Sequence, residues 1–191
     1  IQLSIDRIRE KYLNKIKDDR EDFSSYLNTI TKQIKDIEHL LNEFSDFARM
    51  PKPIFEKIDL VQTISTTVKL LEVSDENINI NFSHPSSSFF IFADEEQLNR
   101  VFINLIKNSI ESINEIKSEN VDFKGKINID IIEDKEYIYV NVLDNGVGFD
   151  LVDKTKMLTP YYTTKKSGTG LGLAIVTKII NDHNSLINFN S

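Results

Sequence analysis

The segment Asp144-Asn145-Gly146-Val147-Gly148 places a carboxylate next to two glycines, directly after an apolar stretch of the chain. A carboxylate in this position can accept a hydrogen bond from an amine, for example the exocyclic amine of adenine. Gly146 and Gly148 allow the backbone to pass close to a flat ring and to adopt a positive φ. The same residue types also form ordinary Asx turns, so the segment alone fits both a nucleotide site and a plain turn.

A second glycine-rich segment, Gly168-Thr169-Gly170-Leu171-Gly172-Leu173, leads directly into an apolar helix. Its glycines leave backbone N–H groups accessible at the helix start, where the helix dipole favours an anion such as a triphosphate. Hydroxyls and positive charge lie just before it, at Thr163, Thr164, Lys165 and Lys166. The segment lacks the lysine pattern of a P-loop and does not follow a strand, which argues against P-loop and Rossmann sites. The alternative is that the glycines serve only close packing.

A pair of asparagines, Asn104 and Asn108, is spaced so that both side chains share one face of a predicted helix, with Glu111 one turn further on. An amide oxygen is a hard, neutral ligand suited to Mg²⁺, which keeps several waters and the phosphates of a nucleotide. The alternative is a solvated polar face, which a lone pair of asparagines does not exclude.

The elements that must position these residues follow from periodicity, caps and turn residues. A helix is predicted over 60–71 with Asp59 as its cap, and a second helix runs from the cap Asp94 to about Ile116. A third helix is predicted over 170–180. Strands are predicted over 78–82, 89–92, 126–132, 137–143 and 186–189, and residues 145–169 are predicted to form a loop rich in Gly, Thr and Lys.

The first fifty residues have a different pattern, with apolar residues at helical spacing on both sides of the charged run 17–22. The run is predicted to be a turn, and Pro51-Lys52-Pro53 ends the second helix. The two helices form a hairpin whose apolar stripes are too long to be buried between them. We expect a second copy to complete a four-helix bundle, the alternative being a hairpin folded onto its own domain.

Composition excludes several classes of function. The 191 residues carry a net charge of −7, which argues against nonspecific binding to nucleic acid or to an anionic membrane surface. The chain has no cysteine, which excludes disulfides, thiolate nucleophiles and Cys-based zinc sites. No apolar stretch approaches the roughly 20 residues that span a bilayer, and no signal peptide is recognisable.

Taken together, the candidate segments resemble the N, G1, F and G2 boxes of the GHKL ATPases, in the version found in histidine kinases. They occur in that order: Asn104/Asn108, Asp144-x-Gly146-x-Gly148, Pro160-Tyr161-Tyr162-Thr163-Thr164-Lys165 and Gly168-x-Gly170-x-Gly172. The hairpin resembles the dimerisation and phosphotransfer domain of these kinases. The segments 1–4 and 47–53 look most similar to nitrogen-regulation sensor kinases of the NtrY type.

The resemblance implies an α+β fold in two domains. Residues 1–53 would be a partial dimerisation and histidine-phosphotransfer hairpin, half of a dimeric four-helix bundle. Residues 54–191 would be a GHKL-type α/β sandwich that binds ATP, truncated before its last strand. The parent protein would be a protein-histidine kinase of a two-component system, a homodimer acting on a cognate response regulator, with no direct contact to nucleic acid. This part would be cytoplasmic and the parent anchored in the inner membrane.

The resemblance also implies roles for the matching residues, with ATP and Mg²⁺ as cofactors. Asn108 would coordinate Mg²⁺ and Asn104 would support the phosphate side. Asp144 would bind the adenine amine, with Gly146 and Gly148 lining the base. The nucleotide would also be held by Gly168, Thr169, Gly170, Leu171 and Gly172. The segment between Asp150 and Ser167 would be a short lid over the site, and Thr164 and Lys165 would steady this lid or the γ-phosphate.

The chain departs from the family pattern at several positions. Tyr161 and Tyr162 replace the usual phenylalanine pair, and Ser109 and Ser112 stand where alanine is usual but are small enough to pack. None of the three histidines, His39, His84 and His183, matches the phosphoacceptor motif, which would lie before residue 1. The chain alone is therefore expected to bind nucleotide without autophosphorylation. The alternative is a non-catalytic dimerisation or decoy fragment with weakened nucleotide binding; an ATPase of the chaperone or mismatch-repair kind is disfavoured by the hairpin.

Overall fold

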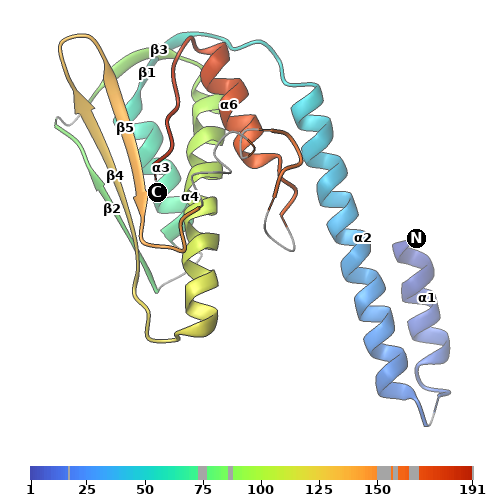
Figure 1. Ribbon diagram of the computed structural model, residues 1–191. Coiled ribbons are helices and arrows are strands. Elements are labelled where there is room, and N and C mark those ends of the chain that lie inside the picture. Colours follow the sequence, from blue (N-terminus) through green and yellow to red (C-terminus); the bar gives the residue numbers. More distant parts are fainter. Residues whose placement is uncertain are drawn as a thin grey trace. The chain divides into compact units, whose positions relative to one another are not determined.

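The computed structural model describes residues 1–191 except 17, 73–76, 86–87, 150–155, 157–158, 164–167 and 191, and for His39 only the backbone. The chain divides into two compact units (Figure 1), the first comprising Ile1–Met50 and the second comprising Pro51–Thr164 and Gly168–Ser191. None of the described helices is both long enough and apolar enough to cross a bilayer.

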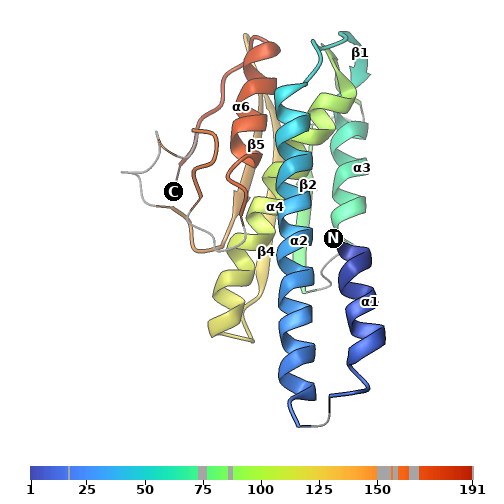
Figure 2. The same cartoon turned by 90° about the vertical axis from the view of Figure 1, so that its right-hand side faces the viewer.

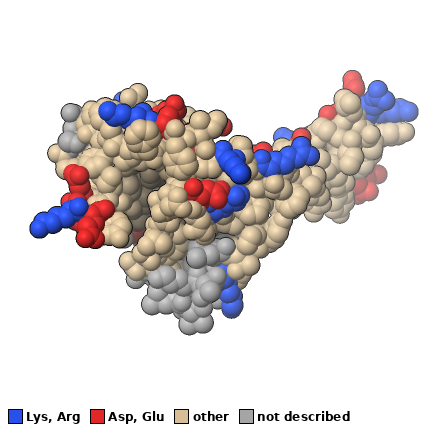
Figure 3. All heavy atoms as spheres, turned by 90° about the horizontal axis from the view of Figure 1, so that it is seen from above, with Lys and Arg blue, Asp and Glu red and all other residues tan. Residues whose placement is uncertain are grey.

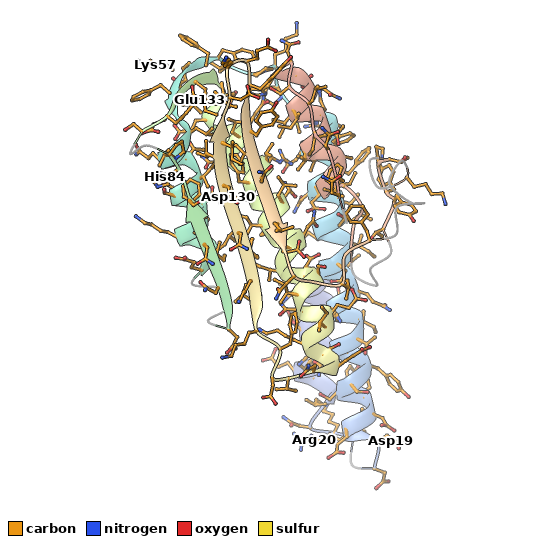
Figure 4. The ribbon with its side chains drawn as sticks, turned by 60° about the vertical axis from the view of Figure 1, so that its left-hand side comes forward. Asp19, Arg20, Lys57, His84, Asp130 and Glu133 are labelled. Atoms are coloured by element: carbon orange, nitrogen blue, oxygen red, sulfur yellow. The ribbon has the colours of Figure 1, made fainter. Side chains whose placement is uncertain are left out.

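The first unit is a pair of helices, α1 (Gln2–Tyr12) and α2 (Arg20–Ala48). The predicted turn 17–22 is shorter than expected, since Asp19 is already the N-cap of α2 and the helix begins at Arg20. These two residues mark the helix start in Figure 4. Three acidic or basic residues in the first turn do not break a helix, because Glu21 and Asp22 interact favourably with the positive end of its dipole.

The helices of the first unit contact each other through a small apolar interface. Ile5 of α1 and Leu27 of α2 are both 5% exposed. A guanidinium nitrogen of Arg9 donates to the side-chain oxygen of Asn28 over 2.8 Å, an exposed hydrogen bond between the two helices. Helix α2 ends at Ala48, shortly before Met50 and Pro51. Proline cannot donate a helix hydrogen bond, and it disfavours helical backbone at the residue before it.

The second unit contains two small sheets. β2 (Ile78–Ser83), β4 (Gly125–Glu133) and β5 (Ile138–Asp144) form one sheet in the order β2-β4-β5, with β2 parallel and β5 antiparallel to β4. β1 (Glu56–Asp59) pairs antiparallel with β3 (Phe90–Ala93) in the other. Strand alternation turns Ile127, Ile129 and Ile131 of β4 inward, and the first two are 0% exposed.

Three helices of the second unit, α3 (Leu60–Glu72), α4 (Glu95–Glu119) and α6 (Gly172–Asp182), lie on one face of the three-stranded sheet (Figures 1 and 2). The core lies between this layer and the sheet and includes Ile64 and Ile106, both 0% exposed. The opposite face of the sheet carries polar residues such as Asn128 and Asp130, the latter labelled in Figure 4. This arrangement confirms the expected α+β fold.

Two aspartates cap the helices as predicted. Asp94 Oδ1 accepts from the N–H of Gln97 over 3.0 Å at the start of α4. Asp59 Oδ1 accepts from the N–H of Phe89 over 2.9 Å and from that of Val61, at the start of α3, over 3.1 Å. The hydrogen bond from the Phe89 N–H is the largest of the causes that lower the pKa of Asp59 below its ordinary value.

A third aspartate closes the predicted turn between β4 and β5. Asp134 Oδ1 accepts from the N–H groups of Glu136 and Tyr137, each over 2.8 Å. These bonds, that of Glu136 first, lower the pKa of the Asp134 carboxyl. Burial, followed by the hydrogen bond to Asp134, raises the pKa of Tyr139 on β5.

His183 joins the C-terminal end of α6 to the N-terminal end of α4. Its Nε2 accepts from the N–H of Asp94 over 3.0 Å, and its Nδ1 lies 2.8 Å from the carbonyl oxygen of Ile179. These contacts require a neutral ring with its hydrogen on Nδ1. The ring of Phe55 packs against it with centroids 5.0 Å apart.

Two predicted elements differ from the structure. β1 was not expected, because only one of its four residues, Ile58, is buried and the run is too short to show alternation. The strand predicted over 186–189 is wrong, since the described residues there are in no strand. A Schellman-type end to α6, with Asn184 at φ 52° and the N–H of Ser185 bonded to Ile180 O, precedes this segment, which finds no hydrogen-bonded strand partner.

Charged side chains of both signs are mixed on the face seen from above in Figure 3, where uncharged residues occupy most of the visible surface. On β1, the ammonium group of Lys57 lies 4.6 Å from the centre of the Phe90 ring on β3, a favourable cation–π distance. On this face, acidic and basic side chains do not separate into fields of one sign.

Candidate functional site

Asp144 is the last residue of β5, and hydrogen bonds hold both oxygens of its carboxylate. Oδ1 accepts from the N–H of Gly146 over 2.9 Å, which is an Asx turn. Oδ2 accepts from the hydroxyl of Ser109 on α4, also over 2.9 Å. The Asx turn, which the sequence analysis gave as an alternative, is therefore present. Together with the Ser109 hydroxyl, it orients the carboxylate of Asp144.

The glycine segment after Asp144 lies directly on α4. A β-carbon built onto Gly146 would lie 2.7 Å from the backbone carbon of Ser112, too close for any residue except glycine. The N–H of Val147 points to the carbonyl oxygen of Ser112 over 3.4 Å. Gly148 has φ 67°, a left-handed conformation that L side chains rarely adopt. Close packing on α4 and backbone geometry therefore both require these glycines.

Asn145 fastens the same segment to the start of β4. Its Oδ1 accepts from the N–H of Lys126 over 2.8 Å, and its Nδ2 donates to the carbonyl oxygen of Lys124 over 3.0 Å. The N–H of Asn145 in turn donates to Lys126 O over 3.2 Å. The backbone beside Asp144 is thus held from the sheet on one side and from α4 on the other.

Asn104 and Asn108 lie on the face of α4 that meets the start of α6, and both are half-buried. A β-carbon built onto Gly172 would lie 3.1 Å from Asn104 Oδ1 and 3.9 Å from Asn108 Nδ2. Asn104 Nδ2 donates to Arg100 O over 2.8 Å, which directs its Oδ1 away from its own helix backbone. The structure therefore brings together the predicted asparagine pair and the last glycine of the second segment.

The second glycine segment is anchored just before α6. Gly170 has φ 69°, and a β-carbon there would lie 2.7 Å from the carbonyl oxygen of Tyr162. Gly170 O accepts from the N–H of Tyr161 over 3.0 Å. Leu171 is 0% exposed, and its N–H points to the hydroxyl of Thr169 over 3.3 Å. The buried leucine fixes the point at which the chain enters the helix.

Some of the predicted site residues are not brought into this arrangement. Thr164 and Lys165 lie outside the described residues, so their suggested role in the lid remains a prediction. Gly168 is described as exposed, irregular backbone. Within the described part of the chain there is no cluster of three His, Cys, Asp or Glu residues that could hold a metal ion.

Ser109 is a site residue whose contact the sequence did not reveal. It is 5% exposed and stands next to Asn108, so its small size pointed only to packing. A polar side chain at a core position of an amphipathic helix is the one local signal, because a buried hydroxyl needs a partner. Its partner Asp144 lies 35 residues further along the chain, and no local pattern specifies that pairing.

The family model described as histidine kinase-, DNA gyrase B-, and HSP90-like ATPase matches residues 93–191. The nitrogen regulation protein NtrY of Azorhizobium caulinodans is 35% identical over 190 residues, which are 100% of this chain and 24% of that protein. Sporulation kinase A of Bacillus subtilis is 32% identical over 184 residues, covering 94% of this chain and 29% of that protein.

Solved histidine kinases have the same fold. The kinase ThkA in complex with the response regulator protein TrrA superposes with a TM-score of 0.70 and 26% identity, over 96% of this chain and 52% of that one. The catalytic domain of ThkA alone gives a TM-score of 0.59 and 31% identity, over 68% of this chain and 81% of that one.

The chain spans about a quarter of the length of the curated relatives that it matches. Several of those relatives are named as sensor histidine kinases of the NtrY-like kind. The matched range 93–191 contains both glycine segments and the asparagine pair on α4. The chain therefore belongs to the histidine kinase-, DNA gyrase B- and HSP90-like ATPase family, as a relative of the sensor histidine kinases.

Proposed function

We propose that this chain is the ATP-binding and kinase module of a two-component sensor histidine kinase, which binds Mg-ATP for phosphoryl transfer to a histidine other than its own three. The observation that carries the proposal is the single helix α4, which contacts both glycine segments. Ser109 bonds Asp144, and Asn104 lies against Gly172. A base site and a phosphate site are then joined along one rigid element.

Asp144 is proposed to accept a hydrogen bond from the exocyclic amine of adenine. Each of its oxygens already accepts one hydrogen bond, and a carboxylate oxygen has a second lone pair for a ligand. Gly146 and Gly148 would line the base, since neither has a side chain that would fill the space beside the ring.

The phosphates are proposed to lie where α4 meets α6, beside Asn104, Asn108 and Gly172. Asn108 fits Mg²⁺ as its one protein ligand, because an amide oxygen is a hard donor and Mg²⁺ takes most other ligands from water and phosphates. When bound with the nucleotide, the ion neutralises charge on the phosphates during transfer. The segment 168–172, which leads into α6, would direct backbone N–H groups at the same phosphates. Thr164 and Lys165 would steady the lid or the γ-phosphate.

The proposal assigns residues 1–53 to a dimerisation and phosphotransfer hairpin and residues 54–191 to the catalytic domain. The exposed apolar residues of α2, such as Ile37 and Leu41, support pairing with a second copy. A cognate response regulator would be the other partner, and this part would act in the cytoplasm below an inner-membrane anchor.

The proposed phosphoacceptor is not among the three histidines of this chain. Both ring nitrogens of His183 are already in hydrogen-bonding contacts, with Asp94 N and Ile179 O, which leaves no free lone pair for attack on phosphorus. We expect no acid-labile label on His39, His84 or His183 after incubation with γ-labelled ATP. Label on any of them contradicts this part of the proposal.

Calorimetric titration with Mg-ADP tests nucleotide binding directly. The unmodified chain should bind, and Asp144→Asn should raise the dissociation constant by at least about tenfold, because an amide replaces the charged acceptor. Asp130→Asn is the matched control, since Asp130 lies on the outer face of the same sheet and bonds Ser83 there. Equal affinities of the two variants, or no binding by the unmodified chain, would refute the proposal and favour a non-catalytic fragment.

A further inference from the structure

The hydroxyl of Ser109 is directed away from the backbone of its own helix. Hydroxyls inside helices commonly donate to the carbonyl four residues earlier, as Thr177 does to Leu173 O over 2.9 Å. Ser109 instead donates to Asp144 Oδ2 over 2.9 Å, although the residue is only 5% exposed. A buried hydroxyl with this partner links the middle of α4 to the end of β5.

The two donors to Asp144 act on different oxygens. The N–H of Gly146 occupies Oδ1 and the hydroxyl of Ser109 occupies Oδ2. One donor on each oxygen opposes rotation of the carboxylate about its Cβ–Cγ bond. With only the Gly146 bond, the plane of the carboxylate could turn and Oδ2 would have no fixed direction. Ser109 therefore determines where the remaining lone pair of Oδ2 points.

The Ser109–Asp144 pair also determines whether a ligand at this place must donate or accept a hydrogen bond. The Ser109 hydroxyl donates its single hydrogen to Asp144. The hydroxyl oxygen of Ser109 and the carboxylate oxygens of Asp144 therefore present only lone pairs to an incoming group. A purine with an amino group at position 6 brings donors to that place and is matched. A purine with an oxo group there brings an acceptor, and two acceptors facing each other leave a desolvated group unpaired.

We propose that Ser109 is a positioning residue that orients Asp144 and thereby makes the site select 6-amino over 6-oxo purine nucleotides. The inference rests on the proposed function, because it names a determinant of specificity in the same site. Ser109 acts through Asp144 and need not touch the base itself.

The test compares the affinities of Mg-ADP and Mg-IDP, which differ in the group at position 6, for the unmodified chain and for Ser109→Ala. Removing the hydroxyl should raise the dissociation constant for ADP about tenfold and leave that for IDP nearly unchanged. The ADP/IDP preference therefore falls by about the same factor. Ser118→Ala, on the same helix with its hydroxyl bonded to Glu115 O, should leave both affinities unchanged.

A double-mutant cycle separates positioning from a general loss of structure. In the Asp144→Asn background, Ser109→Ala should have little further effect on ADP affinity, because the group that it orients has been replaced. Equal losses for ADP and IDP, or additive losses in the double variant, would overturn the inference while leaving the proposed function standing. Failure of the unmodified chain to bind either nucleotide would overturn both. Circular dichroism of each variant verifies that it is folded, and IDP binding by Ser109→Ala at the unmodified affinity verifies its site.

Discussion

The two units of the chain bury their apolar residues to very different degrees. In the second unit, core residues from α3, α4 and the sheet, such as Ile64, Ile106 and Ile127, are 0% exposed. In the hairpin, Ile5 and Leu27 are the buried apolar residues among those described, while Ile37 and Leu41 of α2 are 58% and 59% exposed. The second unit therefore supplies its own core, whereas the stripe of α2 has its apolar surface available for a partner.

The same contrast concerns polar groups. The second unit ties distant segments together with side-chain hydrogen bonds, through Asp59, Asp94, Asp144 and His183. In the described part of the hairpin, a side-chain hydrogen bond from Arg9 to Asn28 links α1 to α2. A site that must hold a carboxylate in one orientation belongs in the first kind of environment, because a satisfied polar network makes its surroundings rigid.

Ile106→Ala tests whether the core of the second unit stabilises it, and it has the largest expected effect on the free energy of unfolding. The side chain is 0% exposed in α4, so its loss should lower the free energy of unfolding by about 2–5 kcal/mol through lost burial and a residual cavity. Urea denaturation followed by circular dichroism measures it. Leu143→Ala, at a site 64% exposed on β5, should change stability by less than about 0.5 kcal/mol. Similar losses for the two variants would contradict the location of the core.

Leu41→Ala tests whether the exposed apolar residues of α2 in the hairpin mediate dimerisation. If α2 packs against a second copy, removing this side chain should weaken association by about 2 kcal/mol, which is roughly 30-fold in the dimer dissociation constant. Sedimentation equilibrium over a range of concentrations measures the association. Leu186→Ala is the control, because Leu186 is 89% exposed in the second unit. An unchanged dimer, or a monomeric unmodified chain, would refute dimerisation through this stripe.

His183→Phe tests the polar connections of the second unit. The variant keeps a ring beside Phe55 but leaves the Asp94 N–H without its acceptor. It also removes the Nδ1 contact to Ile179 O, which still accepts from the backbone N–H of residue 183. The free energy of unfolding should fall by about 1–2 kcal/mol. The same change at the exposed His84 should have a smaller effect. Equal effects at the two histidines, in thermal or urea unfolding, would mean that the bridge between α6 and α4 contributes nothing.

The smallest expected effect is the pH dependence that Asp59 contributes. Its pKa in the folded protein is lowered from 3.8, first by the Phe89 N–H, so its stabilisation is present above the unfolded-state value. That contribution is lost as the pH falls below about 4 and through the lower folded-state pKa. The stability difference between the unmodified chain and Asp59→Asn should therefore be measurable at pH 7 and shrink by pH 2.5. A difference that is constant over this range would show that the carboxylate's charge is irrelevant.

Local features of the sequence predict much of the fold. Helical periodicity with Asp59 and Asp94 as caps locates α3 and α4, and the alternating pattern locates β4 and β5. β1 was missed because a four-residue strand has too little alternation to stand out. The strand expected over 186–189 failed because alternation indicates which face a strand would present, but not whether a partner strand is available for its hydrogen bonds.

The sequence alone determined the places where this chain needs glycine, capping aspartates and apolar faces, because these are properties of residues within a few positions of each other. Only the tertiary structure decided which of those places meet. Ser109 reaches Asp144 across 35 residues, and His183 reaches Asp94 across 89. Such pairings depend on how the helices pack on the sheet, which is a property of the whole core and not of any local pattern. The residues of the proposed site can therefore be identified from the sequence, whereas the contacts that orient them form only when the chain folds.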